Sequence, residues 1–278
     1  MIIGQALAKA RDSLQRSSET PFLDAVLILA STNGVTKEWI LQSQSEQLDP
    51  AVYEKFDKKV RRRQKGVPIA YITGEKEFYG IRFHVDERVL IPRPDTETLV
   101  EAGLGVDARR FLDICTGCGC VAAAVSAHKP GAEIIASDVS PGALDVCRIN
   151  FESGGFGVTT LLSDGFDQID GVYDCILSNP PYLSDEEWHT EYGDTWTEPA
   201  SALRAGEDGL DVIRRIVADS VDHLAPRGHL FIEASPHQMP AIEKMFVQAG
   251  FEAIRLCRDI GDRDRVIGGT NGTHAQGV

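Results

Sequence analysis

The sequence FLDICTGCGC at residues 111–120 decides the fold class of this chain. Its first residues are mostly apolar and indicate a buried strand. Gly117 and Gly119 follow closely, and the next stretch, VAAAV at 121–125, is typical of a helix. Glycines let the backbone come close to a ligand, and the start of a helix presents N–H groups to it. A strand, a glycine turn and a helix in this order predict a cofactor-binding turn in an α/β domain.

Acidic residues after the next two expected strands support this interpretation. Residues 134–137 indicate a strand that runs into Asp138, about 20 residues beyond the glycine turn, where a carboxylate accepts hydrogen bonds from ribose hydroxyls. Asp164 follows the next strand and is placed near an adenine edge, with an ordinary helix cap as the alternative. Together these residues indicate an adenosine-containing cofactor. Its identity stays open, because GCGCVA at 117–122 also fits the G-x-G-x-x-A pattern of dinucleotide-binding proteins.

Short apolar strands alternate with helices from Arg110 onward, which predicts a parallel sheet covered on both faces. Seven such strands with interleaved helices make a doubly wound, Rossmann-like α/β domain. The expected strands lie at residues 110–114, 132–137, 158–162, 172–178, 228–234, 251–257 and 264–268.

The N-terminal part has a different pattern, which predicts a small helical bundle. Thr20, Thr36 and Asp49 are each placed to cap a helix. Around Gly80, within residues 76–91, apolar and polar residues alternate as in a β-hairpin. The expected parts are a helical domain at 1–70, a linker with the hairpin at 71–95, and the cofactor-binding domain at 96–278.

The sequence NPPY at residues 179–182 follows the strand expected at 172–178. Ligands of open parallel sheets bind beyond the carboxyl ends of the strands, so this turn is expected beside the glycine turn. An amide or aromatic amino nitrogen is a poor nucleophile, because its lone pair is delocalised, and it must be held in line with the group it attacks. The side-chain carbonyl of Asn179 and the backbone carbonyl of Pro180 can each accept one N–H of an NH₂ group.

The rest of the NPPY turn suits the same chemistry. Both hydrogen bonds strengthen as positive charge develops on the nitrogen, which is the differential stabilisation that catalysis requires. Pro180 and Pro181 fix the backbone, and Tyr182 is expected to stack on the planar group. No general base is needed, since the proton can pass to water after transfer. The pattern favours methyl transfer from S-adenosylmethionine to nitrogen over a turn that only ends a strand.

Composition limits the classes of partner. The chain has 278 residues, of which 42% are hydrophobic and 25% charged, as in ordinary globular proteins. It lacks a long apolar run and a secretory signal at its start, so a cytoplasmic protein without a membrane partner is expected. A formal net charge of −14 disfavours a nucleic-acid substrate. The basic cluster at residues 58–65 is interpreted as a solvated helix face, with local phosphate contact as the alternative.

The six cysteines lack the spacing of a disulfide framework and are expected to be reduced. Cys115 and Cys118 form a C-x-x-C, but no second pair of ligands follows, so no metal site is expected.

With these motifs the sequence resembles the release factor glutamine methyltransferase family. Its members methylate the side-chain nitrogen of the glutamine in the Gly-Gly-Gln tip of peptide chain release factors. The resemblance extends over nearly the whole chain. Besides the glycine turn and NPPY, it is carried by PIAYITG at 68–74, FYG at 78–80, LIPRPDTE at 90–97, EP at 198–199, AL at 202–203 and GEDGL at 206–210.

The resemblance implies a class I methyltransferase domain that uses S-adenosylmethionine and releases S-adenosylhomocysteine. It also implies that the helical domain at 1–70 helps to grip a release factor. By position it assigns cofactor contacts to Cys115, Thr116, Gly117, Cys118, Gly119, Asp138, Asp164, Gly165 and Asn179, and the substrate amide to Asn179, Pro180, Pro181 and Tyr182.

Three positions depart from the family's pattern. Cys115 stands where the family usually has glycine, so the backbone there is expected to manage without extra freedom, with cofactor affinity at stake. Gly165 replaces a bulkier apolar residue expected against the adenine, and Ala234-Ser235 is unusual without an evident catalytic consequence.

Other functions share parts of this pattern. An adenine N6-methyltransferase or a ribosomal-protein glutamine methyltransferase would use the same NPPY chemistry. A nicotinamide-dependent oxidoreductase would use the glycine turn but would leave NPPY without a role. A non-catalytic cofactor-binding adaptor would bind without turnover.

Overall fold

The computed structural model describes residues 1–192 and 196–272, and the chain divides into two compact units, Met1–Glu75 and Lys76–Val278. The first unit ends close to the boundary expected after residue 70. Most of the expected linker, residues 76–95, is part of the second unit. No helix within the described residues has the length and apolar character needed to span a bilayer.

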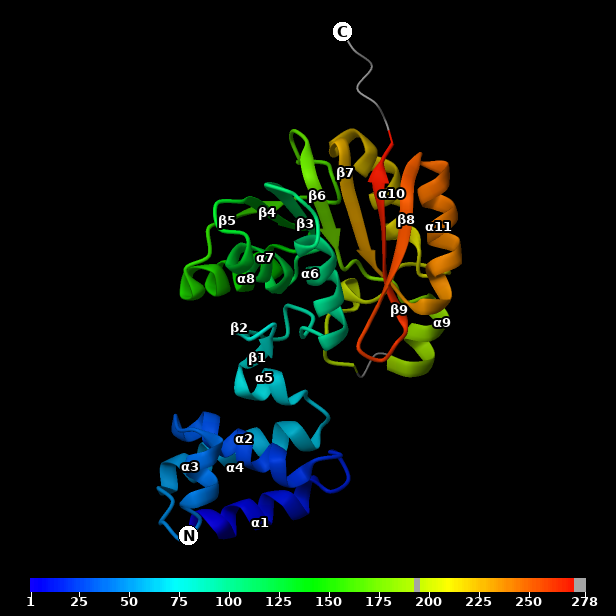
Figure 1. The fold of residues 1–278 in the computed structure, drawn as a ribbon. Helices are drawn as coiled ribbons and strands as arrows, with labels where there is room; N and C mark the ends of the chain where they lie inside the picture. Colours follow the sequence, from blue (N-terminus) through cyan, green and yellow to red (C-terminus); the bar gives the residue numbers. More distant parts are fainter. Residues whose placement is uncertain (193–195, 273–278) are drawn as a thin grey trace. The chain divides into compact units, whose positions relative to one another are not determined.

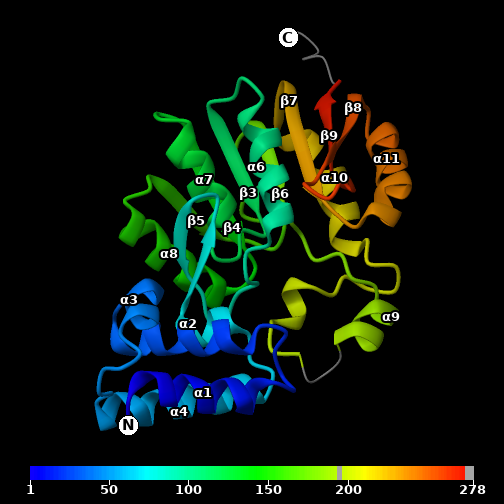
Figure 2. The same cartoon turned by 60° about the horizontal axis from the view of Figure 1, so that its bottom comes forward.

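The first unit is helical, as the sequence indicates. Its helices pack around a core that includes Leu7, Leu14, Leu29 and Phe56, all nearly inaccessible to solvent. Figure 2 shows the three longest helices running alongside one another. The helices are α1 (Ile3–Leu14), α2 (Pro21–Asn33), α3 (Lys37–Gln42), α4 (Pro50–Gln64) and α5 (Ile69–Thr73).

Two of the three expected caps in this unit are confirmed. The Asp49 carboxylate accepts hydrogen bonds from the first N–H groups of α4, and the Thr36 hydroxyl accepts one from Trp39 at the start of α3. The expected cap at Thr20 is wrong in detail. Thr20 does precede α2, but its hydroxyl donates to the Asp24 carboxylate, Oγ1 to Oδ1 3.3 Å, and not to the helix backbone.

Three of the six basic residues in the cluster at residues 58–65 form ion pairs within the unit. Lys58 and Arg61 each pair with an acidic residue one turn earlier on α4. Arg63 forms an ion pair with the buried carboxylate of Asp24, Nε to Oδ2 2.7 Å. These contacts favour a helix face with local charge pairing over a phosphate site.

The second unit is built on a seven-stranded sheet. The order of strands across the sheet is β5-β4-β3-β6-β7-β9-β8, and the strands are labelled in Figure 1. The strands are β3 (Arg110–Ile114), β4 (Glu133–Asp138), β5 (Val158–Leu162), β6 (Tyr173–Ser178), β7 (Leu224–Glu233), β8 (Phe251–Arg258) and β9 (Asp264–Asn271).

The expected fully parallel sheet is wrong at one side. Strands β3 to β7 are parallel, but β9 runs antiparallel to both β7 and β8. A short connection explains this direction, because β8 and β9 are joined by residues 259–263, which suffice for a hairpin and not for a crossover helix. The Rossmann-like, seven-strand fold class is otherwise confirmed.

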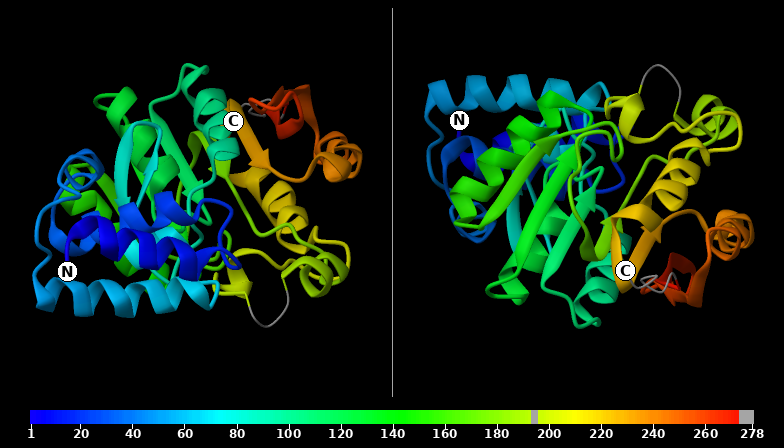
Figure 3. Two further views of the ribbon diagram at one scale, coloured as in Figure 1. Left: turned by 90° about the horizontal axis from the view of Figure 1, so that it is seen from below. Right: turned by 90° about the horizontal axis from the view of Figure 1, so that it is seen from above.

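Helices cover both faces of the sheet (Figures 1 and 3). On one face α10 and α11 bury Ile213, Ile216 and Ile242 against Leu112 of β3 and Ile176 of β6. On the other face lie α6, α7 and α8. These helices are α6 (Glu97–Leu104), α7 (Cys120–His128), α8 (Pro141–Gly154), α10 (Asp211–His223) and α11 (Met239–Gln248), and shorter turns are η1 (Pro94–Thr96), α9 (Asp185–Glu187), η2 (Trp188–Tyr192), η3 (Ala200–Ala202) and η4 (Pro236–Gln238).

The expected hairpin forms from β1 (Glu75–Phe78) and β2 (Ile81–His84), with Gly80 at φ 74° in its turn. Asn150 of α8 connects β2 to the glycine turn. Its Oδ1 accepts from the His84 N–H at 2.6 Å, and its Nδ2 donates to the carbonyl of Cys118 at 2.8 Å. The hairpin therefore helps to hold the glycine turn in place.

Register places the loops of interest at one edge of the sheet. Ile114, the last residue of β3, pairs with Ser137 of β4 on one side and with Ser178 of β6 on the other. The residues that follow these strands therefore meet at a common edge. This edge is where the strand order reverses around β3, the usual position of a ligand site in such sheets.

Candidate active site

A cleft lies at the carboxyl edge of the sheet in the second unit, with about 1190 Å³ of space between its atoms, open solvent included. It joins the glycine turn to the NPPY turn, as the sequence predicts. Of the expected site residues, those that line it are Cys115, Thr116, Gly117, Cys118, Asp138, Asp164, Gly165, Asn179 and Pro181. Gly119, Pro180 and Tyr182 are not among its lining residues.

The glycine turn is held from below by Asp113, a residue of β3 that the sequence did not single out as part of the site. Its carboxylate accepts from the Thr116 hydroxyl, Oγ1 to Oδ2 2.6 Å, and from the Ala122 N–H of α7 at 3.2 Å. Burial raises the pKa of Asp113 to about 7, while these two hydrogen bonds oppose the shift. Asp113 thus fixes both ends of the turn.

Cys115 has a left-handed backbone, with φ at 61°. This corrects the expectation that the backbone manages without a glycine's freedom. The chain adopts the conformation that glycine favours and carries the strain of a side chain in it. Burial raises the pKa of the Cys115 thiol well above its usual range, so the group stays protonated.

The two glycines of the turn have different roles. Gly117 has φ 55°, lines the cleft, and a Cβ built on it would meet no protein atom within 4 Å. A Cβ on Gly119 would lie 2.7 Å from both Cys147 Sγ and a ring carbon of Phe151 on α8. Gly119 also uses its own N–H within the turn, donating to the Thr116 carbonyl at 2.9 Å. Gly119 is therefore required for packing of the turn against α8.

Asp138 lies at the end of β4 with its carboxylate at the cleft. Oδ2 accepts from the Gly117 N–H at 2.9 Å, and Oδ1 accepts from the Ser140 N–H at 2.9 Å. Burial raises the pKa of Asp138, and the backbone hydrogen bonds oppose that shift. A carboxylate has lone pairs left after these two bonds, so it can still accept from hydroxyl groups in the cleft.

Asp164 and Gly165 form the far wall beyond β5. Asp164 does not act as a helix cap. Its carboxylate pairs with Arg215 of α10, Oδ1 to Nη1 3.0 Å, and both side chains are about half exposed at the cleft. Gly165 has φ 58°, which explains the glycine in place of the expected apolar residue. Its missing side chain faces the Arg215 guanidinium at 3.5 Å.

Asn179 follows β6 and reaches the cleft with its amide held in one orientation. Its Nδ2 donates to the hydroxyl of Thr96, at 3.1 Å, so Oδ1 points away from Thr96. Pro180 is buried, and Pro181 lines the cleft. The Tyr182 ring packs against the cluster of Leu183, Trp188 and Leu203, and its stacking on a substrate stays a prediction.

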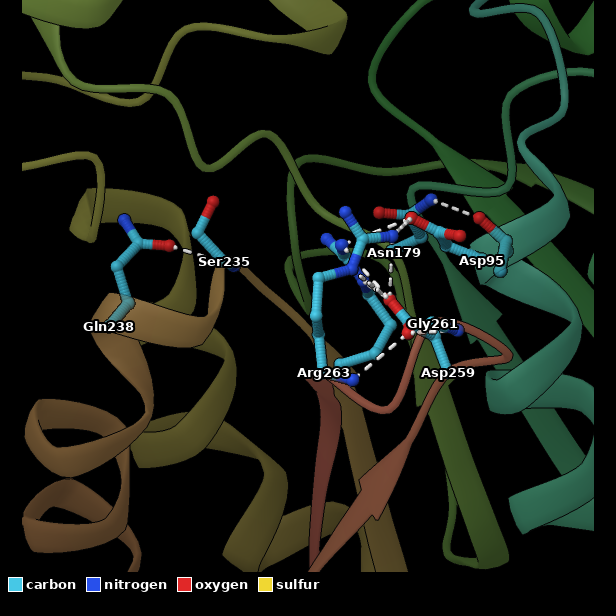
Figure 4. Close-up of polar contacts among 9 residues, drawn as sticks. Asp95, Asn179, Ser235, Gln238, Asp259, Gly261 and Arg263 are labelled. Carbon is cyan, nitrogen blue, oxygen red and sulfur yellow. Dashed lines mark hydrogen bonds and ion pairs between the residues drawn. The ribbon is translucent and has the colours of Figure 1, made fainter.

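The backbone after NPPY is fixed by contacts from two distant segments. The Tyr182 carbonyl accepts from Gln238 Nε2 at 2.9 Å. Gln238 in turn accepts from the Ser235 N–H at 3.2 Å (Figure 4). Ser235, part of the Ala234-Ser235 pair noted as unusual from the sequence, lies directly before η4. A Cβ on Gly209 would lie 2.3 Å from the Tyr182 carbonyl oxygen, so only glycine fits there.

Glu198 ties the loop after NPPY to the segment before α6. Its buried carboxylate accepts from the Ile91 N–H at 2.9 Å, from Arg93 Nη2 at 2.5 Å and from the Trp196 indole at 3.1 Å. Arg93 lines the cleft. These contacts join the LIPRPDTE segment to the EP segment, although the two lie about a hundred residues apart.

Sequence reasoning missed Thr96 and Glu233 as parts of this site. Thr96 and Glu233 are 2% and 1% exposed. Burial raises the pKa of Glu233 to about 7, and the hydrogen bond from Thr96 opposes that shift. Glu233 Oε2 has no hydrogen-bond partner among the described residues. The only signal in the sequence was the position of Thr96 within LIPRPDTE.

The cysteines are free thiols within the structure, and the described residues include no cluster of three or more His, Cys, Asp or Glu side chains suited to a metal ion. Cys118 and Cys120 also line the cleft. Cys118 lies in the glycine turn, and Cys120 is the first residue of α7.

Comparison with known proteins identifies the family. Residues 5–74 match the model of the PrmC N-terminal domain, and residues 94–206 match that of the methyltransferase small domain. The release factor glutamine methyltransferase of Escherichia coli is 36% identical over 265 residues, which are 94% of this chain and 95% of that protein. The chain belongs to the release factor glutamine methyltransferase family. Membership makes it a methyltransferase and removes the nicotinamide-dependent oxidoreductase from consideration.

Further relatives agree with this assignment. The release factor glutamine methyltransferase of Neisseria gonorrhoeae is 36% identical and aligned over 90% of this chain and 93% of its own. Among solved structures, the catalytic domain of hMettl16 in complex with a MAT2A 3'UTR hairpin has a TM-score of 0.58 at 17% identity, over 77% of this chain and 83% of that one. A methyltransferase from Pyrococcus furiosus has a TM-score of 0.55 at 17% identity, over 71% and 92%. These two structures show the shared fold.

The cleft suits the cofactor of this class. S-adenosylmethionine has a ribose, an adenine and a charged methionine part, and the cleft offers a carboxylate at Asp138, a second one at Asp164, and open space over Gly117. Apolar walls at Val139 and Ile216 complete it. The donor set therefore fits an adenosyl ligand.

Proposed function

We propose that this protein transfers a methyl group from S-adenosylmethionine to the side-chain amide nitrogen of the glutamine in the Gly-Gly-Gln tip of peptide chain release factors. The observation that carries the proposal is Asn179, whose amide is fixed by Thr96 at the edge of a cleft that also contains the glycine turn. The names of relatives at 33–36% identity over nearly their whole length support the substrate.

Asn179 supplies the acceptor that this reaction needs. With Nδ2 bound to Thr96, its Oδ1 is available to accept one N–H of the glutamine amide. In the proposal the backbone carbonyl of Pro180 accepts the other N–H, and Tyr182 stacks on the amide plane. The two acceptors orient the nitrogen lone pair and stabilise the positive charge that develops on it.

The cofactor supplies an electrophilic methyl group on a sulfonium. The amide nitrogen donates an electron pair to the methyl carbon, the C–S bond breaks with its electron pair left on sulfur, and the nitrogen loses one proton to water. No side chain has to act as a base. Cys115, Thr116, Gly117 and Cys118 are assigned to the methionine part, Asp138 to the ribose, and Asp164-Gly165 to the adenine. The role of Gly119 is to shape the turn.

The central experiment is transfer of a labelled methyl group to a purified release factor, followed by mass spectrometry to locate it. Label is expected on the tip glutamine, and none on a release factor whose tip glutamine is replaced by alanine. Parallel reactions with a ribosomal protein and with adenine-containing RNA and DNA test the alternative substrates, which are expected to stay unlabelled. Transfer to one of these in place of the release factor would overturn the proposal.

The variant Asn179→Ala separates catalysis from cofactor binding. Turnover should fall about 100-fold or more, because an oriented acceptor is lost at the reacting nitrogen. The dissociation constant for S-adenosylmethionine, measured by calorimetry, should stay within about threefold. Near-normal turnover in this variant would contradict the role assigned to the Asn179 side chain.

A further inference from the structure

The side-chain amide of Asn179 has two possible orientations, and they present opposite groups to a substrate. With Oδ1 toward the substrate it accepts a hydrogen bond, whereas after a flip it would present a second donor to an NH₂ group. The proposed reaction works with one orientation only. Some part of the fold must therefore select it.

Thr96 makes this selection possible, because it is almost fully buried and its hydroxyl meets Asn179 Nδ2 at 3.1 Å. It lies at the end of η1, directly before α6, and its own N–H donates to the Arg93 carbonyl at 3.1 Å. The Thr96 side chain thus starts from a fixed backbone position beside the NPPY turn.

In this contact the Thr96 hydroxyl oxygen is the acceptor, because Asn179 Nδ2 can only donate. A hydroxyl has a single hydrogen to donate, and an ionised carboxylate can only accept. Glu233 is buried, and Thr96 lowers the pKa of its carboxyl group by stabilising the charged form, so an ionised Glu233 favours a Thr96 hydrogen on the side away from Asn179. The Thr96 oxygen is then available to Asn179 as an acceptor.

We propose that Thr96 is a positioning residue for methyl transfer, whose hydroxyl holds the Asn179 amide with Oδ1 toward the substrate nitrogen. This inference rests on the proposed function and adds a specific residue to it. Thr96 does not touch the reacting atoms. It acts through Asn179, which lies 83 residues later in the sequence and donates a hydrogen bond to it.

Neighbouring charges hold this region rigid. Asp95, next to Thr96, forms ion pairs with Arg263 and Arg265, each at 3.0 Å. Asp259, in the loop after β8, accepts from Arg263 Nε at 3.0 Å. Figure 4 shows Asn179, Asp95, Arg263 and Asp259 gathered at this place. The segment that carries Thr96 is therefore tied to the end of the sheet.

The test compares Thr96→Val, which keeps the shape but removes the hydroxyl, with Thr96→Ser, which keeps the hydroxyl. Methyl transfer to the release factor is measured at pH 8, where Glu233 is mainly ionised. We expect kcat of Thr96→Val to fall about 10- to 100-fold, with the S-adenosylmethionine dissociation constant within about threefold of the wild type. Thr96→Ser should retain kcat within about threefold.

A matched control is Ser220→Ala, which removes another fully buried hydroxyl from α10. It should leave kcat unchanged. Should Thr96→Val fail to fold, as judged by circular dichroism, Thr96→Ala replaces it with the same expectation. Unchanged kcat in a folded hydroxyl-free variant overturns the positioning role while leaving the proposed function intact.

A double-mutant cycle with Asn179→Ala distinguishes positioning from a merely structural role. If Thr96 acts through Asn179, adding Thr96→Val to Asn179→Ala should lower kcat by less than about twofold. A further loss equal to that seen in the wild-type background would overturn the inference. Absence of methyl transfer by the wild type itself would overturn the proposed function, and the positioning role with it.

Discussion

The carboxylate of Asp138 accepts a hydrogen bond from the Gly117 N–H, with 2.9 Å between Oδ2 and the nitrogen. This bond connects the end of β4 to the turn after β3. It therefore links Asp138, which is expected to bind the ribose, to Gly117, which is expected to let the backbone come close to the cofactor. Because Oδ1 is likewise bonded to the Ser140 N–H, the carboxylate has a fixed orientation at the cleft. A ligand meets it already aligned.

The variant Asp138→Ala should weaken S-adenosylmethionine binding about 10- to 100-fold, because it removes both the acceptor for the ribose and the support of the Gly117 turn. Calorimetric titration measures this directly. Asp219→Ala, at an exposed position on α10, is the control and should bind like the wild type. Equal affinities for the two variants would contradict the role of Asp138.

Replacing Cys115 by glycine should stabilise the protein by about 0.5–1 kcal/mol, because the residue has φ 61° and glycine relieves the strain of a side chain in that conformation. The measurement is the free energy of unfolding in urea, taken from the transition of the second unit. Cys115→Ala removes the thiol but keeps a Cβ, so it should give no such gain. If alanine stabilises as much as glycine, the thiol and not the backbone is the cause.

Gly209→Ala should cost about 2–4 kcal/mol of stability and also reduce turnover, because its Cβ would overlap the Tyr182 carbonyl oxygen at 2.3 Å and displace the segment after Pro181. Gly131→Ala is the matched control. Gly131 has a similar φ of 84°, but a Cβ there meets no atom within 4 Å. It should therefore lose only about 1 kcal/mol and keep full turnover.

Burial of Glu233 predicts a pH dependence of stability. Its pKa is about 7 in the folded protein and near 4.5 when unfolded, so between these values the folded state binds more protons than the unfolded state. The contribution of Glu233 to stability is therefore greatest below pH 4.5 and is lost as the pH rises through 7. Asp113, with a pKa also raised to about 7 by burial, adds to the same trend.

Glu233→Gln removes this titration. At pH 8 the variant should be more stable than the wild type by about 1–3 kcal/mol, and its stability should change less between pH 5 and 7.5. Denaturant unfolding at several pH values checks both. The remaining slope should come from Asp113. A variant whose stability parallels that of the wild type at every pH would contradict the buried, raised-pKa state of Glu233.

Much of the second unit follows from local patterns. The expected strands at 110–114 and 158–162 coincide with β3 and β5, because short apolar runs bounded by turn residues define such strands closely. The meeting of the glycine turn, Asp138 and Asn179 also follows, since parallel strands in register bring their carboxyl ends together. These features depend on one segment at a time.

Other features could not be predicted in this way, because they depend on contacts between distant segments. The antiparallel direction of β9 leaves no trace in its apolar pattern. Thr96 is 83 residues from Asn179, and its importance appears only once α6 packs beside the NPPY turn. Gly119 fits the cofactor motif in sequence, but the position of Phe151 on α8 shows that it serves packing. Tertiary structure decides whether a side chain at a glycine position would meet the cleft or a neighbouring helix.

Insertion of β9 between β7 and β8 has a consequence for biosynthesis. A ribosome makes Thr96 and Asn179 well before Arg265. Because β9 lies between β7 and β8, these two strands cannot join into one sheet until β9 has emerged. Arg265 then brings its charge to Asp95. A nascent chain paused before residue 264 should thus contain both turns of the cleft and Arg263, but lack the ion pair between Arg265 and Asp95.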